Sequence, residues 1–243
     1  MSDRLVLLGT GTCQLQEDRI ASSVLLELDV LRVVFDFGRG VAGRLTSLGF
    51  KQDDIRHVVL SHFHPDHLSD LIPFLQAATW SQIDPRTADL HLYGPEGLDA
   101  LFRGLLGLFD ALMRDDGFRL HLHEIRDHRL VIEGFELVSS ELPPAGNRGL
   151  KFTRRGVTCA LTGDSLFHDE EIEFLRDVDL AIVDAGHLSD DELIELAVQS
   201  RARRLVCSHL YREIDGAKLA TLATRRGYDG EIVLGEDLMS FTL

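Results

Sequence analysis

Short apolar runs alternate along the chain with stretches in which apolar residues have helical spacing. Runs bounded by glycine, proline or aspartate are typical of buried strands, whereas apolar residues at positions i, i+3 and i+4 are typical of helices. The pattern predicts helices at 41–48, 68–77, 98–112, 189–200 and 215–226. It predicts strands at 4–8, 22–28, 31–36, 55–60, 90–93, 120–125, 129–132, 135–140, 150–153, 157–161, 179–183, 204–207, 231–234 and 238–242, with a β-meander across 120–140.

This alternation of strands and helices indicates an α/β protein, and no linker, charge block or low-complexity segment interrupts it. A chain of 243 residues, 44% of them hydrophobic, is long enough to bury one substantial core. We therefore expect residues 1–243 to form a single domain.

One loop, which we call the central loop, concentrates metal-binding chemistry. Residues 60–70 read Leu-Ser-His-Phe-His-Pro-Asp-His-Leu-Ser-Asp, between a predicted strand and a predicted helix. Alternate side chains at the end of a strand point the same way, so we expect His62 and His64 to face together. The turn then directs Asp66 and His67 to the other side. Neutral imidazole and carboxylate are ligands for zinc and similar cations, so two pairs on one loop favour a two-metal centre over a solvated polar loop.

Further polar residues lie at the carboxyl ends of other predicted strands, where open α/β sheets place their sites. Taken singly, a histidine in such a place is more often structural. Taken together, these residues supply the ligands that the central loop lacks. Asp36 also ends a strand, where it either orients a metal-bound histidine or caps the next turn. The remaining candidates, from later strands, are Asp164, Asp184, His187 and His209.

The charge and cysteine content restrict the partners. An excess of 40 acidic over 25 basic side chains gives a formal charge of -15, which opposes association with long nucleic acid or an anionic membrane. The three cysteines are far apart and odd in number, which argues against a disulfide framework and for a reducing compartment. Because the sequence shows no export signal, we expect a cytoplasmic protein.

Three other features leave alternatives open. The glycine-rich turn at 9–12 could cradle phosphate, but it lacks the lysine of a P-loop, so a tight structural turn is favoured. His121 and His123 share one face of a predicted strand, as a metal pair would, although a surface strand explains them better. The helix at 98–112 is apolar nearly all round, which fits either a buried helix or the interface of a homodimer.

The central loop resembles the His-x-His-x-Asp-His signature of the metallo-β-lactamase superfamily. Further segments are similar to its ribonuclease Z branch: Leu-Gly-Thr-Gly-Thr at 8–12, Asp-Phe-Gly at 36–38, Tyr-Gly-Pro-Glu-Gly at 93–97, Thr-Gly-Asp at 162–164 and Ser-His at 208–209. The resemblance covers nearly the whole chain. It implies a four-layer αβ/βα sandwich of two mixed β-sheets flanked by helices, with a dinuclear centre at their shared edge.

The resemblance also implies which residues hold two divalent cations, taken to be Zn²⁺ with Mn²⁺ or Fe²⁺ as alternatives. By position, the first cation would be bound by His62 and His64, the second by Asp66, His67 and His209, and both by a bridging Asp164.

The same resemblance implies the catalytic residues. His187 matches the histidine that assists the leaving group or the charge of the transition state, and Asp184 lies where the branch has a glutamate that supports this histidine. Asp66 could both bind metal and orient the attacking water.

Two departures from the family pattern stand out. A third histidine usually completes the first metal site after the meander, and the matching residue here is Glu141. A carboxylate makes that site harder, so Glu141 either binds the cation and favours manganese, iron or magnesium, or points away and leaves the site weak or empty. The other departure is the lack of a long arm between Leu150 and Val157, which, with the negative charge, weighs against transfer RNA.

We therefore expect a metal-dependent hydrolase of a small phosphodiester, such as a cyclic or modified nucleotide. Two cations clamp the diester, lower the pKa of a water between them and offset charge on the attacking and leaving oxygens. The same centre can open a lactone, a thioester or a β-lactam, because its activated water attacks carbonyl carbon as well as phosphorus. A metal-binding protein without turnover is the remaining alternative, and Glu141 is the feature that favours it.

Overall fold

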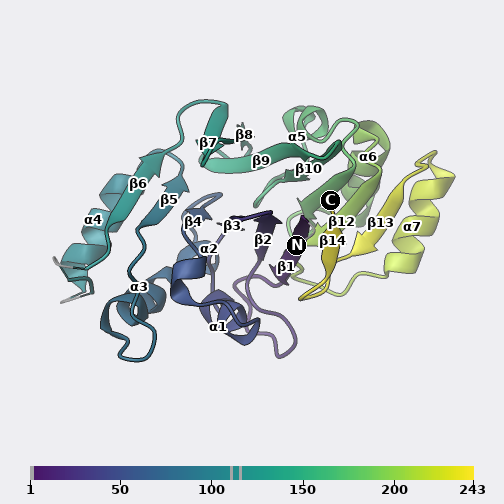
Figure 1. Cartoon of the computed structure of the whole chain (residues 1–243). Coiled ribbons are helices and arrows are strands. Elements are labelled where there is room, and N and C mark those ends of the chain that lie inside the picture. The colour runs from purple at the N-terminus through teal and green to yellow at the C-terminus, as the bar shows by residue number, and fades with distance from the viewer. Residues whose placement is uncertain (1–2, 110–111, 115–116) are drawn as a thin grey trace.

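The computed structural model describes residues 3–109, 112–114 and 117–243 (Figure 1). Its strands are β1 (Arg4–Gly9), β2 (Ser23–Leu28), β3 (Leu31–Phe35), β4 (His57–Val59), β5 (Leu90–Gly94), β6 (Leu120–Glu124), β7 (Arg129–Ile132), β8 (Phe135–Leu142), β9 (Asn147–Arg154), β10 (Val157–Leu161), β11 (Leu180–Asp184), β12 (Arg204–Ser208), β13 (Glu231–Leu234) and β14 (Ser240–Thr242). Its helices are α1 (Val41–Ser47), α2 (Pro65–Leu68), α3 (Leu71–Trp80), α4 (Leu98–Leu108), α5 (Asp169–Phe174), α6 (Asp190–Ser200) and α7 (Gly216–Arg225), with a 3-10 turn at Gln52–Asp54.

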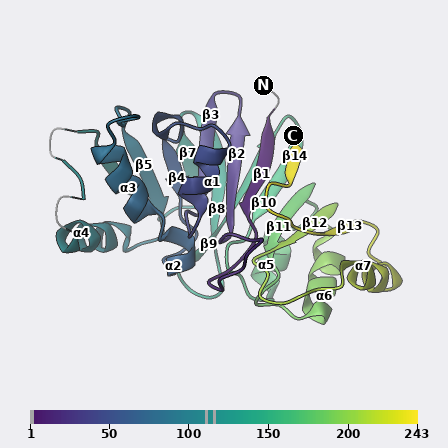
Figure 2. The same ribbon diagram turned by 90° about the horizontal axis from the view of Figure 1, so that it is seen from below.

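Within the described residues the strands form two seven-stranded sheets, in the orders β14-β1-β2-β3-β4-β5-β6 and β13-β12-β11-β10-β9-β8-β7. Each sheet is mixed: β3 to β6 run parallel in the first and β10 to β13 in the second, and the remaining pairs are antiparallel. Figure 2 shows α3 and α4 beside β5 at one end of the molecule and α6 and α7 beside β12 and β13 at the other.

Apolar side chains fill three layers. One layer lies between the sheets and includes Val33 and Ile182. A second, with Phe37 and Phe102, packs α1, α3 and α4 on the outer face of the first sheet, and a third packs α5, α6 and α7 on the second. Because each sheet buries both faces, most of its central strands are apolar throughout. The predicted four-layer sandwich of two mixed sheets is confirmed.

The predicted meander at 120–140 is wrong in its first strand. β6 pairs in parallel with β5 in the first sheet, whereas β7 and β8 form an antiparallel hairpin in the second. The reason is the connection through α4, since a strand-helix-strand crossover sets the second strand parallel to the first. Residues 125–128 then carry the chain across to the other sheet.

Three helices differ from the pattern. The helix expected at 68–77 is divided into α2 and α3, with Asp70 at the break, where its carboxylate accepts hydrogen bonds from the amides of Gly40 and Ala42. The short helix α5 has no counterpart in the prediction, because charged residues outnumber apolar ones in it. The helix expected at 98–112 ends at Leu108, and positions 110 and 111 lie outside the described residues. No helix in the described part of the chain is long and apolar enough to span a bilayer.

The packing of α4 gives a direct test of the outer layer on the first sheet. Phe102 is 0% exposed, whereas Leu108 on the same helix is 74% exposed. We expect Phe102→Ala to lower the free energy of unfolding by about 3–5 kcal/mol, since it removes a buried ring and leaves a cavity. Leu108→Ala should change it by less than about 0.5 kcal/mol. Urea unfolding followed by circular dichroism measures both, and equal effects would contradict the packing described.

Candidate metal centre

The central loop is held in a defined shape at the end of β4. Pro65 begins α2, a position where its fixed backbone angle and missing amide hydrogen are favourable. This places Asp66 and His67 in the first turn of α2, where both are buried. His62 is also buried, whereas His64 is exposed, and their rings lie 4.4 Å apart, edge to face.

Asp36 fixes the orientation of His67. Its carboxylate accepts hydrogen bonds from the amide of Ser61 at 2.7 Å, from the Ser61 hydroxyl at 2.8 Å and from Nδ1 of His67 at 2.8 Å. Asp36 adopts a left-handed backbone conformation, which aspartate tolerates better than most residues. Of the two roles open from the sequence, the structure favours orientation of a histidine. The other ring nitrogen of His67 is thereby directed toward Asp164.

Asp164 contacts residues that follow strands of both sheets. Its Oδ1 lies 3.1 Å from Nε2 of His67 and 3.5 Å from Nε2 of His209, and its Oδ2 lies 3.6 Å from Nε2 of His62. Nε2 of His209 also lies 3.4 Å from Oδ2 of Asp66. Residues far apart in sequence therefore meet where β4, β10 and β12 end.

The ligand-type atoms form groups whose members lie within 4.8 Å of one another. There are three such groups among the described residues. Two of them contain the central-loop residues and are the two sets considered as ligands: His62, His64 and Asp164, and Asp66, His67 and His209. The third contains Asp164, Asp184, His187 and His209.

The residues fit a pair of divalent cations. Nε2 of His62, Nε2 of His67 and Oδ1 of Asp164 are buried and make no well-aligned hydrogen bond among the described residues, although His67 and Asp164 form an ion pair at 3.1 Å. A buried polar atom without a hydrogen bond costs about 1–3 kcal/mol, and a cation placed among these atoms would remove that cost. Imidazole nitrogen and carboxylate oxygen are the donors that zinc and similar cations accept.

The protonation of the cluster agrees with this fit. Burial, together with the nearby His67, lowers the pKa of His62 to about 4, so its imidazole is neutral. Against the opposing effect of burial, His67 and His209 hold the pKa of Asp164 well below its usual range. Burial would lower the pKa of His67, but Asp36 and Asp164 outweigh burial and raise it. Without a cation His67 therefore carries a proton, which metal binding would displace.

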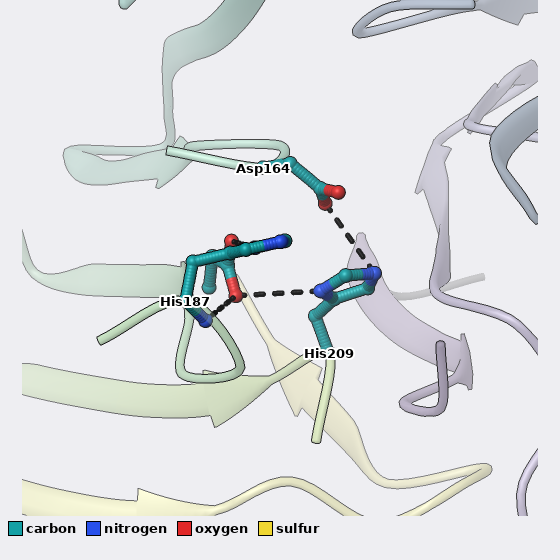
Figure 3. A group of neighbouring side chains, drawn as sticks. Asp164, His187 and His209 are labelled. Carbon is teal, nitrogen blue, oxygen red and sulfur yellow. Dashed lines mark hydrogen bonds and ion pairs between the residues drawn. The ribbon is translucent and has the colours of Figure 1, made fainter. Parts of the chain in front are cut away.

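His187 lies at the rim of this cluster, held by Asp184. Nδ1 of His187 donates to Asp184 at 2.6 Å, and the Asp184 carboxylate also accepts the Gly186 amide at 2.7 Å. That hydrogen bond raises the pKa of His187, despite partial burial. Its ring stacks on that of His209 with 5.3 Å between centroids, and Figure 3 shows Asp164 and His187 grouped around His209. Asp184 also lies 3.3 Å from Nδ1 of His209, so one buried carboxylate orients two histidines.

Comparison with known proteins identifies the family and the fold. A family model described as a beta-lactamase superfamily domain matches residues 32–213. The chain belongs to the metallo-β-lactamase superfamily. A ribonuclease Z of Pyrococcus horikoshii is 25% identical over 270 residues, covering 84% of this chain and 85% of that protein, and places the chain in the ribonuclease Z-like branch.

Solved structures of the superfamily share the fold. The metallo-β-lactamase fold protein YhfI of Bacillus subtilis superposes with a TM-score of 0.81 at 19% identity, covering 99% of both chains. A diphosphatase of the PhnP family superposes with a TM-score of 0.74 at 19% identity, covering 99% of this chain and 98% of that one.

Glu141 is the one ligand predicted from the sequence that the structure does not bring to the cluster. It is exposed at the end of β8, opposite Arg148 of β9, and it belongs to none of the ligand groups in the described chain. Its carboxylate instead accepts the amide of Gly146 at 3.3 Å, within its own hairpin turn. The geometry favours the alternative in which Glu141 points away from the first site.

Two residues near the centre escape prediction from the sequence. Ser61 links Asp36 to His62, since its hydroxyl donates to Asp36 and lies 2.9 Å from Nδ1 of His62. Glu171 is fully buried in α5, and burial, then the charge of Asp184, raises its pKa to about 8, so it adds no negative charge near neutral pH. Ser61 could have been found from its place directly before the superfamily motif, but Glu171 gives no signal because α5 lacks a helical pattern.

Gly38 tests how closely the loop is fitted. A Cβ at Gly38 would overlap the carbonyl oxygen of Asp66, whereas a Cβ at Gly43 in α1 would meet nothing within 4 Å. We expect Gly38→Ala to displace Asp66 and to lower both the zinc content and the thermal midpoint. Gly43→Ala should leave the zinc content unchanged and stabilise slightly, as alanine does in a helix. Elemental analysis and thermal unfolding of both variants check this, and full zinc content in Gly38→Ala would show that the loop adapts.

Proposed function

We propose that this protein is a metal-dependent phosphodiesterase that acts on a small phosphodiester or nucleotide. One observation carries the proposal. The Asp164 carboxylate lies within 3.6 Å of imidazoles from both sets of ligand residues, and the atoms that face one another there are buried. A carboxylate shared between two nitrogen-rich sets is the arrangement that a two-metal hydrolase requires.

The proposed metal ligands follow from the two sets, with Asp164 shared. When bound, two divalent cations polarise the phosphoryl oxygens and make water acidic enough to attack at neutral pH. Asp66 is placed to accept a hydrogen bond from the attacking water, because its carboxylate is buried and its pKa is lowered by His209 against the effect of burial. The ligands proposed are His62, His64 and Asp164 for one cation and Asp66, His67, His209 and Asp164 for the other.

His187 is the proposed general acid. Asp184 fixes its Nδ1 and raises its pKa, so the ring keeps a proton on Nε2 that it can give to the leaving oxygen. Its side chain is 37% exposed, in contrast to the buried His62, His67 and His209, so a substrate can reach it. Asp184 acts through His187 and is a positioning residue.

A cleft beside the central loop suits a small substrate. It has a volume of about 360 Å³, the size of a small-ligand pocket. Its lining includes no residue of the central loop, but the amide of Arg148 in its wall donates to the carbonyl of Ser61 at 2.9 Å, so the cleft lies next to the loop. Arg126 and Arg148 in the lining offer positive charge to a phosphate, and Glu96 and Glu141 line the same cleft. The relative named ribonuclease Z makes RNA the competing substrate, while the net charge of -15 opposes a long one.

The substrate class is tested with bis(p-nitrophenyl) phosphate, a set of cyclic nucleotides, a transfer RNA precursor and a panel of lactones and thioesters. The proposal expects chelator-sensitive hydrolysis of the small diesters, with Asp164→Asn losing it. Hydrolysis of the carbonyl substrates alone would discard the phosphodiesterase. Cleavage of the RNA with no activity on small diesters would replace the small substrate by RNA.

The role of His187 is tested by comparing kcat for two substrates whose leaving groups differ in their need for a proton. We expect His187→Ala to lower kcat about 10²-fold or more for a dialkyl phosphodiester, whose alkoxide must be protonated as it leaves. The loss should be much smaller for bis(p-nitrophenyl) phosphate, because p-nitrophenolate leaves without a proton. His128→Ala, an exposed histidine of the hairpin region, is the matched control. An equal loss on both substrates would contradict a proton-donating role.

A further inference from the structure

Four histidines line the face of the first sheet that is directed at the second sheet, at its β6 edge. We call them the histidine ladder: His57 of β4, His91 of β5, and His121 and His123 of β6. The parallel register sets His57 beside His91 and His91 beside His121, and it sets Tyr93 beside His123. The ladder is separate from the metal centre, since His57 begins β4 and the central loop follows its end.

The ladder is a continuous stack of rings. His57 and His91 stack with 5.2 Å between centroids, and His91 and His121 with 4.6 Å. His123 stacks on Tyr93 at 4.6 Å. A metal pair of His121 and His123 on one strand was the less favoured interpretation of the sequence, and their rings are 6.4 Å apart.

The closest nitrogens of the ladder come from neighbouring strands. Nδ1 of His91 lies 3.1 Å from Nε2 of His123. Two bonds of about 2.0–2.1 Å from a zinc ion, meeting at a tetrahedral angle, span about 3.3–3.4 Å between the nitrogens. The observed nitrogen–nitrogen distance is therefore slightly shorter than in a zinc chelate. A small movement of the exposed His123 ring would convert the hydrogen bond between the two imidazoles into such a chelate.

We propose that His91 and His123 form a second metal site, which binds one zinc or similar nitrogen-preferring divalent ion and leaves its remaining positions to water. The site crosses from β5 to β6, so a bound ion joins the edge strand of the sheet to its neighbour. It shares no residue with the dinuclear centre, and it stands whether or not the proposed hydrolytic function does.

The outer members of the ladder are already engaged. Nε2 of His121 lies 2.8 Å from the carboxylate of Asp89, and Nε2 of His57 lies 3.2 Å from that of Glu133 in the β7–β8 turn. His91 and His123 have no such carboxylate contact among the described residues, and their facing nitrogens contact each other, so a cation between them would displace one proton and no ion pair. Two flanking carboxylates also make the surroundings favourable for positive charge.

The protonation of the pair and its access to solvent agree with this assignment. Burial, and then the neighbouring His57, lowers the pKa of His91, and burial, then His91, lowers that of His123. Both rings are therefore neutral at pH 7, the form in which imidazole binds metal. His91 is half-buried and His123 exposed, so an ion reaches the pair from solvent.

Equilibrium dialysis of the full chain against Zn²⁺, with bound metal counted by elemental analysis, tests the site. We expect His123→Ala and His91→Gln each to bind one equivalent fewer than the wild type. His121→Ala, which removes a ring from the same strand and face, should bind as many as the wild type. His123→Cys replaces one zinc ligand by another and should retain the ion.

Because every variant keeps the residues of the dinuclear centre, the difference between variants reports the ladder alone. Equal zinc content in the wild type, His123→Ala and His91→Gln would overturn the proposal. Loss of the same equivalent in His121→Ala would also overturn it, since the ion would then not be held by the named pair. Circular dichroism of each variant confirms that the fold is kept, and His123, being exposed, is the position least able to disturb it.

Discussion

The arrangement around Asp164 depends on one constraint: a buried carboxylate, which water cannot reach, must be paired with a positive group or coordinate a metal. In this protein that carboxylate faces His62, His67 and His209 within 3.6 Å. Desolvation of an ionised carboxylate is costly unless it is paired or coordinates a metal. The three imidazoles and the cations that we propose between them meet this cost, so the ligands from the two sheets stabilise one another's burial.

The fold supplies these ligands at strand ends. In each sheet a parallel strand stops and its next residues turn into the shared edge, so β4 delivers the central loop, β10 delivers Asp164 and β12 delivers His209. Two carboxylates behind the ligands set their directions: Asp36 orients His67, and Asp184 orients both His187 and His209. Such outer partners fix the tautomer and the ring position of a metal-binding histidine. The proposed ligands, with His187 as the proposed and more exposed acid at the rim, form an arrangement suited to hydrolysis of a phosphodiester.

Much of this could be predicted from the sequence, because the decisive signals are local. The spacing of the central loop and the polar residues at the strand ends indicated which residues meet, and the resemblance to the superfamily implied how they divide into two groups. Long-range pairing was not predictable: the pattern of β6 is that of a strand, but only its partner decides between the two sheets. Glu141 illustrates the same limit, since the turn of its hairpin takes up its carboxylate. The pairing of His91 with His123 likewise depends on the register of two strands.

The central claim is that residues of both sheets converge on two adjacent cations. Anomalous diffraction from crystals grown with Zn²⁺ tests it most directly. The account predicts two peaks about 3.5–4 Å apart, the spacing of two-metal sites, one beside His62 and His64 and the other beside His67 and His209, with Asp164 between them. A single peak there, or none while zinc binds elsewhere on the chain, would contradict it.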